Sequence, residues 1–480
     1  MSSVLLIAPP WGQVYGNYRS LSRRMNFHPP LGLCYLASSL AAAGHRVKVV
    51  DAEAEGLDED VLAALARQEW DVIGFTATTP VFPAAVALAE KMRAHFHGTM
   101  VLGGPHATIV REEAFAGSGC LDYLVCGEGE HTIVRLVETL ADGGDTRTIP
   151  GIVMHDGKGF YFSGPADRQR DLDHLPFPDR SHLNPDNYLW SVPGRGIVPT
   201  TSVIFSRGCP FECTFCSQRF MYGREVTRRS VDNMLAEFEV ILSETPYRHF
   251  VFLDDTLTSS RSIVSALFQG IIDRGYRITF EGETRANLLD TELVKLMKRA
   301  GLVRMNIGIE SGDPEMLKRL KTGVTLDDVR QTLRLLKSFG VETRGTVVIG
   351  APYERRETAM RTLEYLTDLK DLDQPYICIA APYPGTLMRE QALRGEGGAR
   401  LLQDDYGSLK RYGSAAMEVN DLSAADLVEL QSWGLRRTYL RPKRLIYNLG
   451  RAGLRAGVRN GFAFVRSMLS SALKPHAGGN

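Results

Sequence analysis

Three cysteines lie close together in Ser206-Arg207-Gly208-Cys209-Pro210-Phe211-Glu212-Cys213-Thr214-Phe215-Cys216-Ser217, at the spacing C-x3-C-x2-C and directly after the apolar run 202–205. A structural zinc site takes four protein ligands, yet no Cys or His lies between Cys216 and His249. Three thiolates suit a [4Fe–4S] cluster, because the missing fourth ligand leaves one iron open to a small molecule. The spacing therefore favours an iron–sulfur site over a zinc knuckle or three buried thiols.

The segment from Cys209 to Cys216 resembles the cluster loop of the radical S-adenosylmethionine (SAM) enzymes, including the aromatic residue before the third cysteine. In that family the open iron chelates SAM, and one electron from the cluster cleaves SAM to methionine and a 5′-deoxyadenosyl radical. The resemblance implies that Cys209, Cys213 and Cys216 bind the cluster and are catalytic.

Length and composition bound the remaining interpretation. A chain of 480 residues suggests two or three domains at about 150 residues each. Its seven cysteines are an odd, scattered set, which argues for a reducing cytosol over a disulfide framework. No apolar run reaches about 18 residues, and the first residues lack the charged region of a signal peptide. These features predict a cytoplasmic protein.

Residues 1–142 alternate strand-like and helix-like runs, which predicts a doubly wound, Rossmann-like parallel sheet. We expect strands at 4–8, 46–50, 72–75, 100–102 and 123–125, and helices at 31–43, 57–68, 83–96 and 131–141. Ligands of such sheets bind outside the carboxyl ends of the strands.

The loops at those ends are rich in Pro, Gly and Thr, which let a ligand approach the backbone closely and bond its polar rim. Together with 29–33 and the cluster loop, they resemble the cobalamin-binding domain of cobalamin-dependent radical SAM enzymes. The resemblance implies that cobalamin is held by Pro10, Trp11, Thr76, Thr78, Thr79, Gly103, Gly104, His106, Gly127 and Glu128. Domains that supply a lower axial ligand carry Asp-x-His-x-x-Gly after the first strand, and here that position has Pro9-Pro10-Trp11-Gly12. We expect no protein histidine on cobalt, so His106 either touches the corrin edge or bonds to backbone.

The pattern decays into turn signals over 143–198, which predicts a linker with one hairpin within 152–162. Residues 199–390 alternate again, with strands expected at 203–205, 249–253, 277–281, 305–309, 346–349 and 377–380. Helices are expected at 230–243, 260–274, 291–299, 325–339 and 357–369. These units fit a partial (βα)6 barrel, whose chemistry lies at the carboxyl ends of the strands; the radical SAM family has this barrel.

Polar residues follow several of these strands, as a ligand with an ammonium, a carboxylate and a ribose requires. The resemblance places Asp255 near the SAM amino group and Arg285 near its carboxylate. It places Glu310 and Ser311 near the ribose or methionine end, and Phe215 and Gly350 near the adenine. The alternative for each polar side chain is a capping or ion-pairing role at a strand end.

Residues 391–480 are predicted to form a helical C-terminal region with a basic tail, because no acidic residue follows Glu429. Arg451, Arg455 and Arg459 recur every four residues, as in an amphipathic helix on an anionic membrane surface. The alternative, which we favour, is a helix that packs on the barrel and keeps a solvated face. Any membrane contact would be peripheral, at the inner surface.

The features together predict a C-methyltransferase that acts on an unactivated carbon of a natural-product, lipid or tetrapyrrole precursor. The alternative within the family is an oxidative cyclase or rearrangement enzyme without net methyl transfer. A non-catalytic sensor is disfavoured by the intact cluster loop. We expect a small or lipid-like substrate, an electron donor such as flavodoxin or ferredoxin, and no nucleic acid, since no RNA-binding motif is present.

Overall fold

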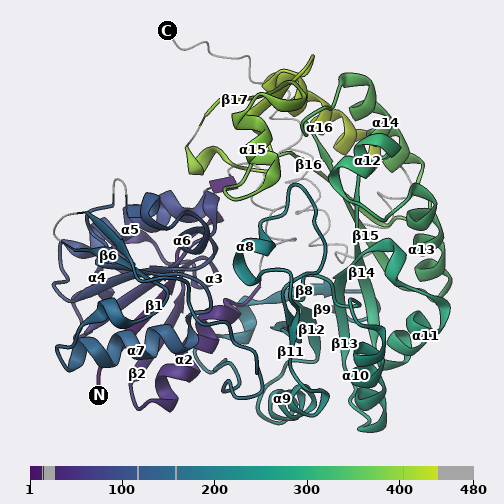
Figure 1. The fold of residues 1–480 in the computed structure, drawn as a ribbon. Coiled ribbons are helices and arrows are strands. Elements are labelled where there is room, and N and C mark those ends of the chain that lie inside the picture. The colour runs from purple at the N-terminus through teal and green to yellow at the C-terminus, as the bar shows by residue number, and fades with distance from the viewer. Residues whose placement is uncertain (13, 16–27, 116–117, 157–158, 404, 442–480) are drawn as a thin grey trace.

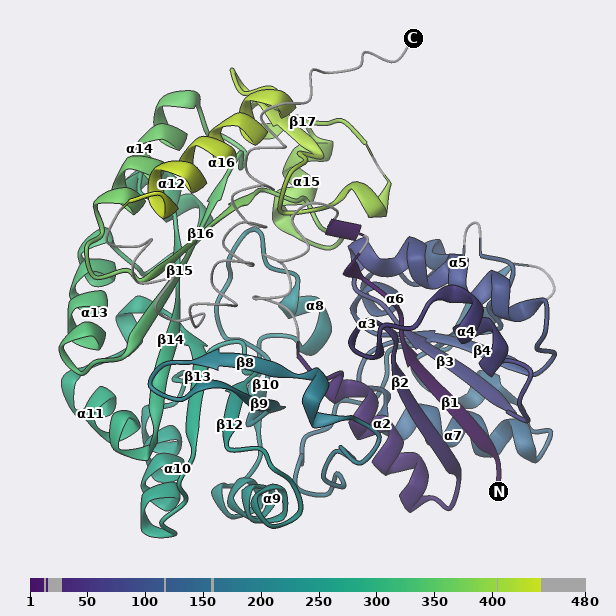
Figure 2. The same ribbon diagram turned by 180° about the vertical axis from the view of Figure 1, so that it is seen from behind.

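The structure is a computed structural model that describes residues 1–12, 14–15, 28–115, 118–156, 159–403 and 405–441. Two α/β units stand side by side: an N-terminal unit, and a larger open barrel followed by a C-terminal cap (Figure 1). The N-terminal unit lies beside the edge of the barrel that carries β8 and β9 (Figure 2). The architecture agrees with the predicted sequence of a Rossmann-like domain and a partial barrel.

The N-terminal sheet has the strand order β2-β1-β3-β4-β5-β6-β7. Its five parallel strands are β1 (Ser3–Ala8), β2 (Arg46–Asp51), β3 (Val72–Thr76), β4 (Thr99–Gly103) and β5 (Tyr123–Val125). All five were predicted, because each carries a short, buried apolar run. The antiparallel strands β6 (Ile152–His155) and β7 (Phe160–Phe162) extend the same sheet.

Helices cover both faces of this sheet (Figure 1). Side chains alternate along β1, so Val4 and Leu6 pack on one face while Leu5 and Ile7 pack on the other. The first face is covered by α2 (Leu31–Ala42) and α7 (Gly129–Ala141). The second is covered by α4 (Glu59–Leu65), α5 (Phe82–Arg93) and α6 (Pro105–Val110), and the short α3 (Ala52–Glu55) follows β2.

The barrel sheet has the order β16-β15-β14-β13-β12-β9-β8. Its six parallel strands are β9 (Gly196–Val203), β12 (His249–Phe252), β13 (Thr279–Thr284), β14 (Leu302–Glu310), β15 (Glu342–Ile349) and β16 (Gln374–Ile379). The predicted strand at 203–205 was placed too late, because Thr200, Thr201 and Ser202 are buried polar residues without an apolar signal. The antiparallel β8 (Leu189–Val192) closes this edge, so residues 143–198 complete both sheets and are more than a linker.

The outer helices of the barrel agree with the predicted ranges. They are α9 (Val231–Glu244), α10 (Arg261–Asp273), α11 (Thr291–Ala300), α13 (Leu326–Ser338) and α14 (Arg356–Asp368), with the short α12 (Pro314–Leu320) between α11 and α13. Local sequence sets their ends: Thr325 and Asp328 form a capping box at the start of α13, and Gly301 ends α11 at φ 115°. Phe268 stacks on Phe280 in the apolar layer between the sheet and these helices.

The C-terminal cap begins after β16. It contains α15 (Leu387–Leu393), the hairpin of β17 (Ala399–Leu401) and β18 (Met417–Val419), and α16 (Ala424–Tyr439). Helix α16 packs beside α14 against β16 (Figure 1), as the helix of a sixth unit would. Among the described residues, no helix combines the length and apolar character that a membrane crossing requires. Arg451, Arg455 and Arg459 of the predicted tail lie outside the described residues.

Candidate active site

The cluster loop lies between β10 (Ser206–Arg207) and α8 (Gln218–Tyr222), and β10 pairs with β11 (Thr227–Arg228). Gly208 begins the loop at φ 97°, and a Cβ there would lie 2.3 Å from the carbonyl oxygen of Glu225. Glycine is therefore required immediately before Cys209. The loop is fixed further by the Thr214 amide, which donates to the Leu320 carbonyl at 3.1 Å.

Cys209, Cys213 and Cys216 are half-buried on this loop, and Cys209 lies near enough to the other two thiols to raise their pKa values. Burial raises the pKa of Cys213 to about 11 and that of Cys216 to about 12, so both thiols are protonated before metal binds. Among the described residues, no group of three Cys, His, Asp or Glu is arranged around a single metal ion. Three thiols on one loop fit the corners of a [4Fe–4S] cluster, where each binds a different iron.

Two neighbouring aspartates, Asp254 and Asp255, follow β12 and have different partners. Asp254 is 3% exposed and accepts hydrogen bonds from the Ser206 hydroxyl at 2.5 Å and the Phe205 amide at 3.1 Å. It therefore holds β10 against the barrel. Burial, helped by Asp254 and Glu283, raises the pKa of Asp255 to about 7. A cationic ligand such as an ammonium group would favour the carboxylate form of Asp255.

Arg285 follows β13 and reaches the cluster loop. Its guanidinium lies 3.9 Å from the centre of the Phe211 ring, and Nη1 lies 3.8 Å from Cys213 Sγ. Nη2 donates to the Thr322 carbonyl, whereas Nε is buried and has no hydrogen-bond partner among the described residues. A positive charge with an unsatisfied buried donor fits an anionic ligand group beside the cluster.

Of the other predicted SAM residues, Phe215 lies on the cluster loop, and Glu310, Ser311 and Gly350 lie at the ends of β14 and β15. Glu310 has φ 61° and accepts from Lys321 Nζ at 2.9 Å. Ser311 is fully buried, and its hydroxyl pairs with that of Thr362 at 2.9 Å. Gly350 has φ 85°, and a Cβ there would lie 2.8 Å from the Leu427 side chain. Their contacts with SAM stay predictions. The Ser311 hydroxyl already has a hydrogen-bond partner in Thr362.

The predicted cobalamin residues gather at the carboxyl edge of the N-terminal sheet. Gly104, at φ 93°, leaves no room for a side chain, because a Cβ would lie 2.6 Å from Thr76 Oγ1. The Gly127 amide donates to Thr108 Oγ1 at 2.9 Å, which joins the loops after β4 and β5. Thr78 is exposed and Gly103 is half-buried at the same edge. This edge of small residues fits close backbone approach to a large ligand.

His106 is fully buried beneath this edge. Its ring centre lies 4.1 Å from that of Phe82 and 4.5 Å from that of Tyr406, and Nδ1 lies 3.4 Å from Thr79 Oγ1. Burial lowers the pKa of His106 to about 3, so its imidazole is neutral. Contact of His106 with the corrin stays a prediction, as do the contacts of Pro10, Trp11 and Thr79.

Sequence reasoning missed the partner of Glu128. Glu128 Oε1 accepts from Arg207 Nη1 at 2.7 Å, and Glu130 Oε1 accepts from Arg207 Nη2 at 2.5 Å. Arg207 lies two residues before Cys209, whereas both glutamates belong to the N-terminal unit. The sequence shows two acids two positions apart at a predicted helix start, and one arginine before the cluster loop. It gives no sign that these residues pair.

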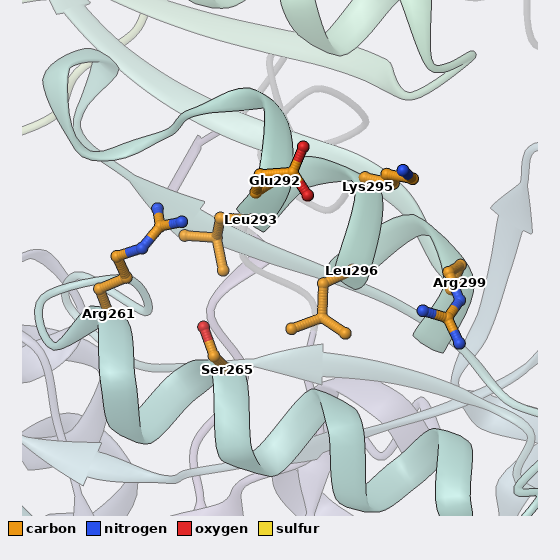
Figure 3. A pocket seen from close by; sticks show the side chains of 7 residues that line it. All are labelled: Arg261, Ser265, Glu292, Leu293, Lys295, Leu296 and Arg299. Atoms are coloured by element: carbon orange, nitrogen blue, oxygen red, sulfur yellow. The ribbon is translucent and has the colours of Figure 1, made fainter.

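The two sheet edges also meet through apolar contacts. Tyr15 is buried in a cluster with Val348, Tyr376 and Cys378 of the barrel, and Trp11 and Phe215 pack against it. The loop after β1 therefore reaches the barrel mouth. A separate hollow has a volume of about 280 Å³. Its lining side chains come from α10 and α11, on the outside of the barrel (Figure 3). It is lined by Arg261, Ser265, Glu292, Leu293, Lys295, Leu296 and Arg299, none of which is a predicted site residue.

Comparison with known proteins agrees with both halves of this site. The Radical SAM superfamily matches residues 203–366, and the B12 binding domain matches residues 21–137. The chain is 30% identical to an uncharacterised methyltransferase of Pyrococcus horikoshii over 88% of this chain and 90% of that protein. It is 28% identical to a hopanoid C-3 methylase of Methylococcus capsulatus, over 74% of this chain and 67% of that one.

Another relative is the anaerobic magnesium-protoporphyrin IX monomethyl ester cyclase of Rubrivivax gelatinosus, 28% identical over 71% of this chain and 62% of that one. The solved structure of the radical SAM methyltransferase TsrM from Kitasatospora setae, with cobalamin and a [4Fe–4S] cluster bound, has the same fold. It matches with a TM-score of 0.71 at 17% identity, over 98% of this chain and all of that one. The chain therefore belongs to the cobalamin-dependent radical SAM enzymes, whose cofactors are a [4Fe–4S] cluster, SAM and cobalamin.

Proposed function

We propose that this enzyme is a C-methyltransferase that acts on an unactivated carbon of a natural-product, lipid or tetrapyrrole precursor. The observation that carries the proposal is the meeting of the two sheet edges, where Tyr15 and Trp11 pack with Phe215 and the barrel mouth. Ligands on these two edges would share one space. The names of the relatives from P. horikoshii and M. capsulatus support methyl transfer.

When bound, the cluster and SAM supply a radical that can abstract hydrogen, and cobalamin supplies a methyl carrier. Cys209, Cys213 and Cys216 would hold the cluster. Arg285 would pair with the SAM carboxylate through its buried Nε, and Asp255 would pair with the ammonium group. The buried apolar cluster around Tyr15 would exclude water from the space between the cofactors.

A second candidate is an oxidative ring closure or rearrangement, which the cyclase name of the R. gelatinosus relative favours. Product mass separates the two candidates, because C-methylation adds one methylene to the substrate and ring closure does not. In either case we expect the substrate to be a small or lipid-like molecule.

The first experiment is anaerobic purification and cluster reconstitution with hydroxocobalamin, followed by visible spectroscopy and iron counting. A variant with Cys209, Cys213 and Cys216 replaced by Ala should lose about four irons and keep its corrin spectrum. Iron without bound cobalamin in the unaltered chain would contradict a methyl carrier in the first domain. The proposal that the enzyme transfers a methyl group would then be rejected.

Two partner interactions belong to the same proposal. Each SAM cleavage consumes one electron, so we expect a one-electron donor such as flavodoxin or ferredoxin. Peripheral membrane contact through the basic tail is tested by cosedimentation of the full chain with anionic phospholipid vesicles. Salt-sensitive binding would support that contact, and recovery of all protein in the supernatant would favour the packed helix.

A further inference from the structure

We propose that the Glu128–Arg207–Glu130 triad positions the cluster loop relative to the cobalamin domain. The two glutamates lie at the start of α7 in the N-terminal unit, and Arg207 lies in β10, directly before the loop. Arg207 and Glu130 are 5% exposed and Glu128 is 8% exposed. The triad is therefore a desolvated contact between the two domains that hold the cofactors.

The two hydrogen bonds of the triad fix the orientation of the Arg207 guanidinium relative to the N-terminal unit. Each terminal nitrogen of the guanidinium bonds a different carboxylate, at 2.7 Å to Glu128 and 2.5 Å to Glu130. A planar fork held at both ends fixes orientation as well as distance, which a single charge pair does not.

Neighbouring groups hold the triad in place. Glu128 Oε2 accepts a hydrogen bond from the backbone amide of Gln169 at 2.8 Å. The Arg207 guanidinium lies 5.4 Å from the centre of the Tyr35 ring on α2. Arg168 donates to the carbonyl of Arg207 at 3.3 Å. The contact is thus surrounded by ordered groups from the N-terminal unit and from the segment between the two sheets.

The strand β10 transmits this contact to the cluster cysteines. Successive side chains of a strand point to opposite sides, and here Ser206 bonds Asp254 of the barrel while Arg207 bonds the other domain. Gly208, whose conformation excludes other residues, then leads into Cys209. A shift at Arg207 would therefore reach the first cluster ligand within two residues.

The proposal rests on the proposed function in one respect, since the consequence of positioning is methyl transfer between the SAM and cobalamin sites. This transfer can be measured without substrate. With a strong reductant, movement of the SAM methyl group to the reduced corrin releases S-adenosylhomocysteine, whereas cluster-dependent cleavage of SAM releases 5′-deoxyadenosine. The ratio of S-adenosylhomocysteine to 5′-deoxyadenosine, called the product ratio below, therefore reports how well the two domains are placed for methyl transfer.

The test compares the unaltered holoenzyme with Arg207→Met. We expect both to hold iron and cobalamin, but the product ratio of the variant should fall at least about fivefold, a loss of about 1 kcal/mol in methyl transfer. Backbone amides in 126–141 and 203–208 should exchange hydrogen at least about tenfold faster. Glu130→Gln, which leaves the cluster loop unaltered, should change both readouts in the same direction.

Two further variants separate positioning from stability. Replacing Arg207 by Met and both glutamates by Gln removes every uncompensated charge, so thermal stability should recover. The product ratio, measured per bound cobalamin because Glu128 is also a predicted cobalamin contact, should stay low. Arg304 bonds Glu281 and Glu342 in a similar buried triad inside the barrel, and Arg304→Met should leave the ratio unchanged. Recovery of the ratio in the triple variant, an equal fall in Arg304→Met, or unchanged exchange in Arg207→Met would each overturn the proposal. Absence of S-adenosylhomocysteine from the unaltered enzyme would instead contradict the proposed methyl transfer, and the exchange data would still test the triad.

Discussion

Two buried arginines, each held between two glutamates, have different consequences because of where their partners lie. Arg304 bonds Glu281 at 2.5 Å and Glu342 at 2.6 Å, and all three residues belong to neighbouring barrel strands. Arg207 makes the same kind of fork to Glu128 and Glu130, but its partners belong to another domain. The two triads have the same chemistry but stabilise different things. The Arg304 triad stabilises the folded barrel, and the Arg207 triad stabilises the docking of the two domains.

The separate cores of the two units explain this division. The barrel has its own apolar cluster around Phe250, Phe268 and Phe280, and the N-terminal sheet has one on each face. Each unit can therefore remain folded when the contact between them weakens. Loss of the barrel triad has no such alternative, because Glu281 and Glu342 would stay buried inside one core without the arginine that bonds both of them.

The largest expected effect is that of Arg304→Met on barrel stability. Burial works against the ionised form of Glu281, but Arg304 and then Arg344 outweigh it and hold the pKa of this carboxyl well below its usual range. Without Arg304, Glu281 would keep the longer contact with Arg344 at 3.5 Å and Glu342 would lose its bond to Arg304, so the cost should be about 3 kcal/mol. Denaturant unfolding of the full chain, followed at the barrel and N-terminal transitions separately, checks this. A loss confined to the N-terminal transition would contradict the assignment.

A smaller effect is expected from Glu130→Gln at the domain contact. Arg207 keeps Glu128, so the variant loses one charged hydrogen bond, worth about 1.5–3 kcal/mol. We expect the loss to appear as faster amide exchange on both sides of the contact, with the barrel unfolding transition unchanged. An equal shift of barrel unfolding would mean that the two triads do not differ in the way described.

The contrast between the triads also marks the limit of prediction from sequence. Strands such as β1 and β12 were predicted because apolar runs are local signals, and Cys209, Cys213 and Cys216 were predicted to be cluster ligands from their spacing within one loop. The bonds of Arg207 span 79 and 77 positions in the chain, and no local pattern indicates which acid meets which base. The family resemblance implied that Glu128 contacts cobalamin, and only the tertiary structure shows its bond to Arg207.

The barrel mouth offers a third case, in which carboxylates lack such an arginine. The pKa of Asp255 is raised to about 7 by burial and by Asp254 and Glu283, opposed by the Gly208 amide. The folded, cofactor-free chain then binds a proton that the unfolded chain releases, so stability should fall as pH rises from about 4 to about 7. Asp255→Asn should remove this part of the decline. Thermal midpoints at about pH 5 and about pH 8 measure it, and an unchanged difference between these midpoints would contradict the raised pKa.

The smallest expected effect lies at the other end of the domain contact. Tyr406 of the C-terminal cap donates to Glu113 of the N-terminal unit at 3.2 Å, and its ring lies 4.5 Å from that of His106. Tyr406→Phe removes an exposed hydrogen bond and keeps the ring, so the change should be about 0.5 kcal/mol. Tyr406→Ala also removes the aromatic contact and should cost more. If Tyr406→Phe increased amide exchange in 126–141 as much as Glu130→Gln, the docking energy would be spread evenly along the contact, and the buried triad would lose its special role.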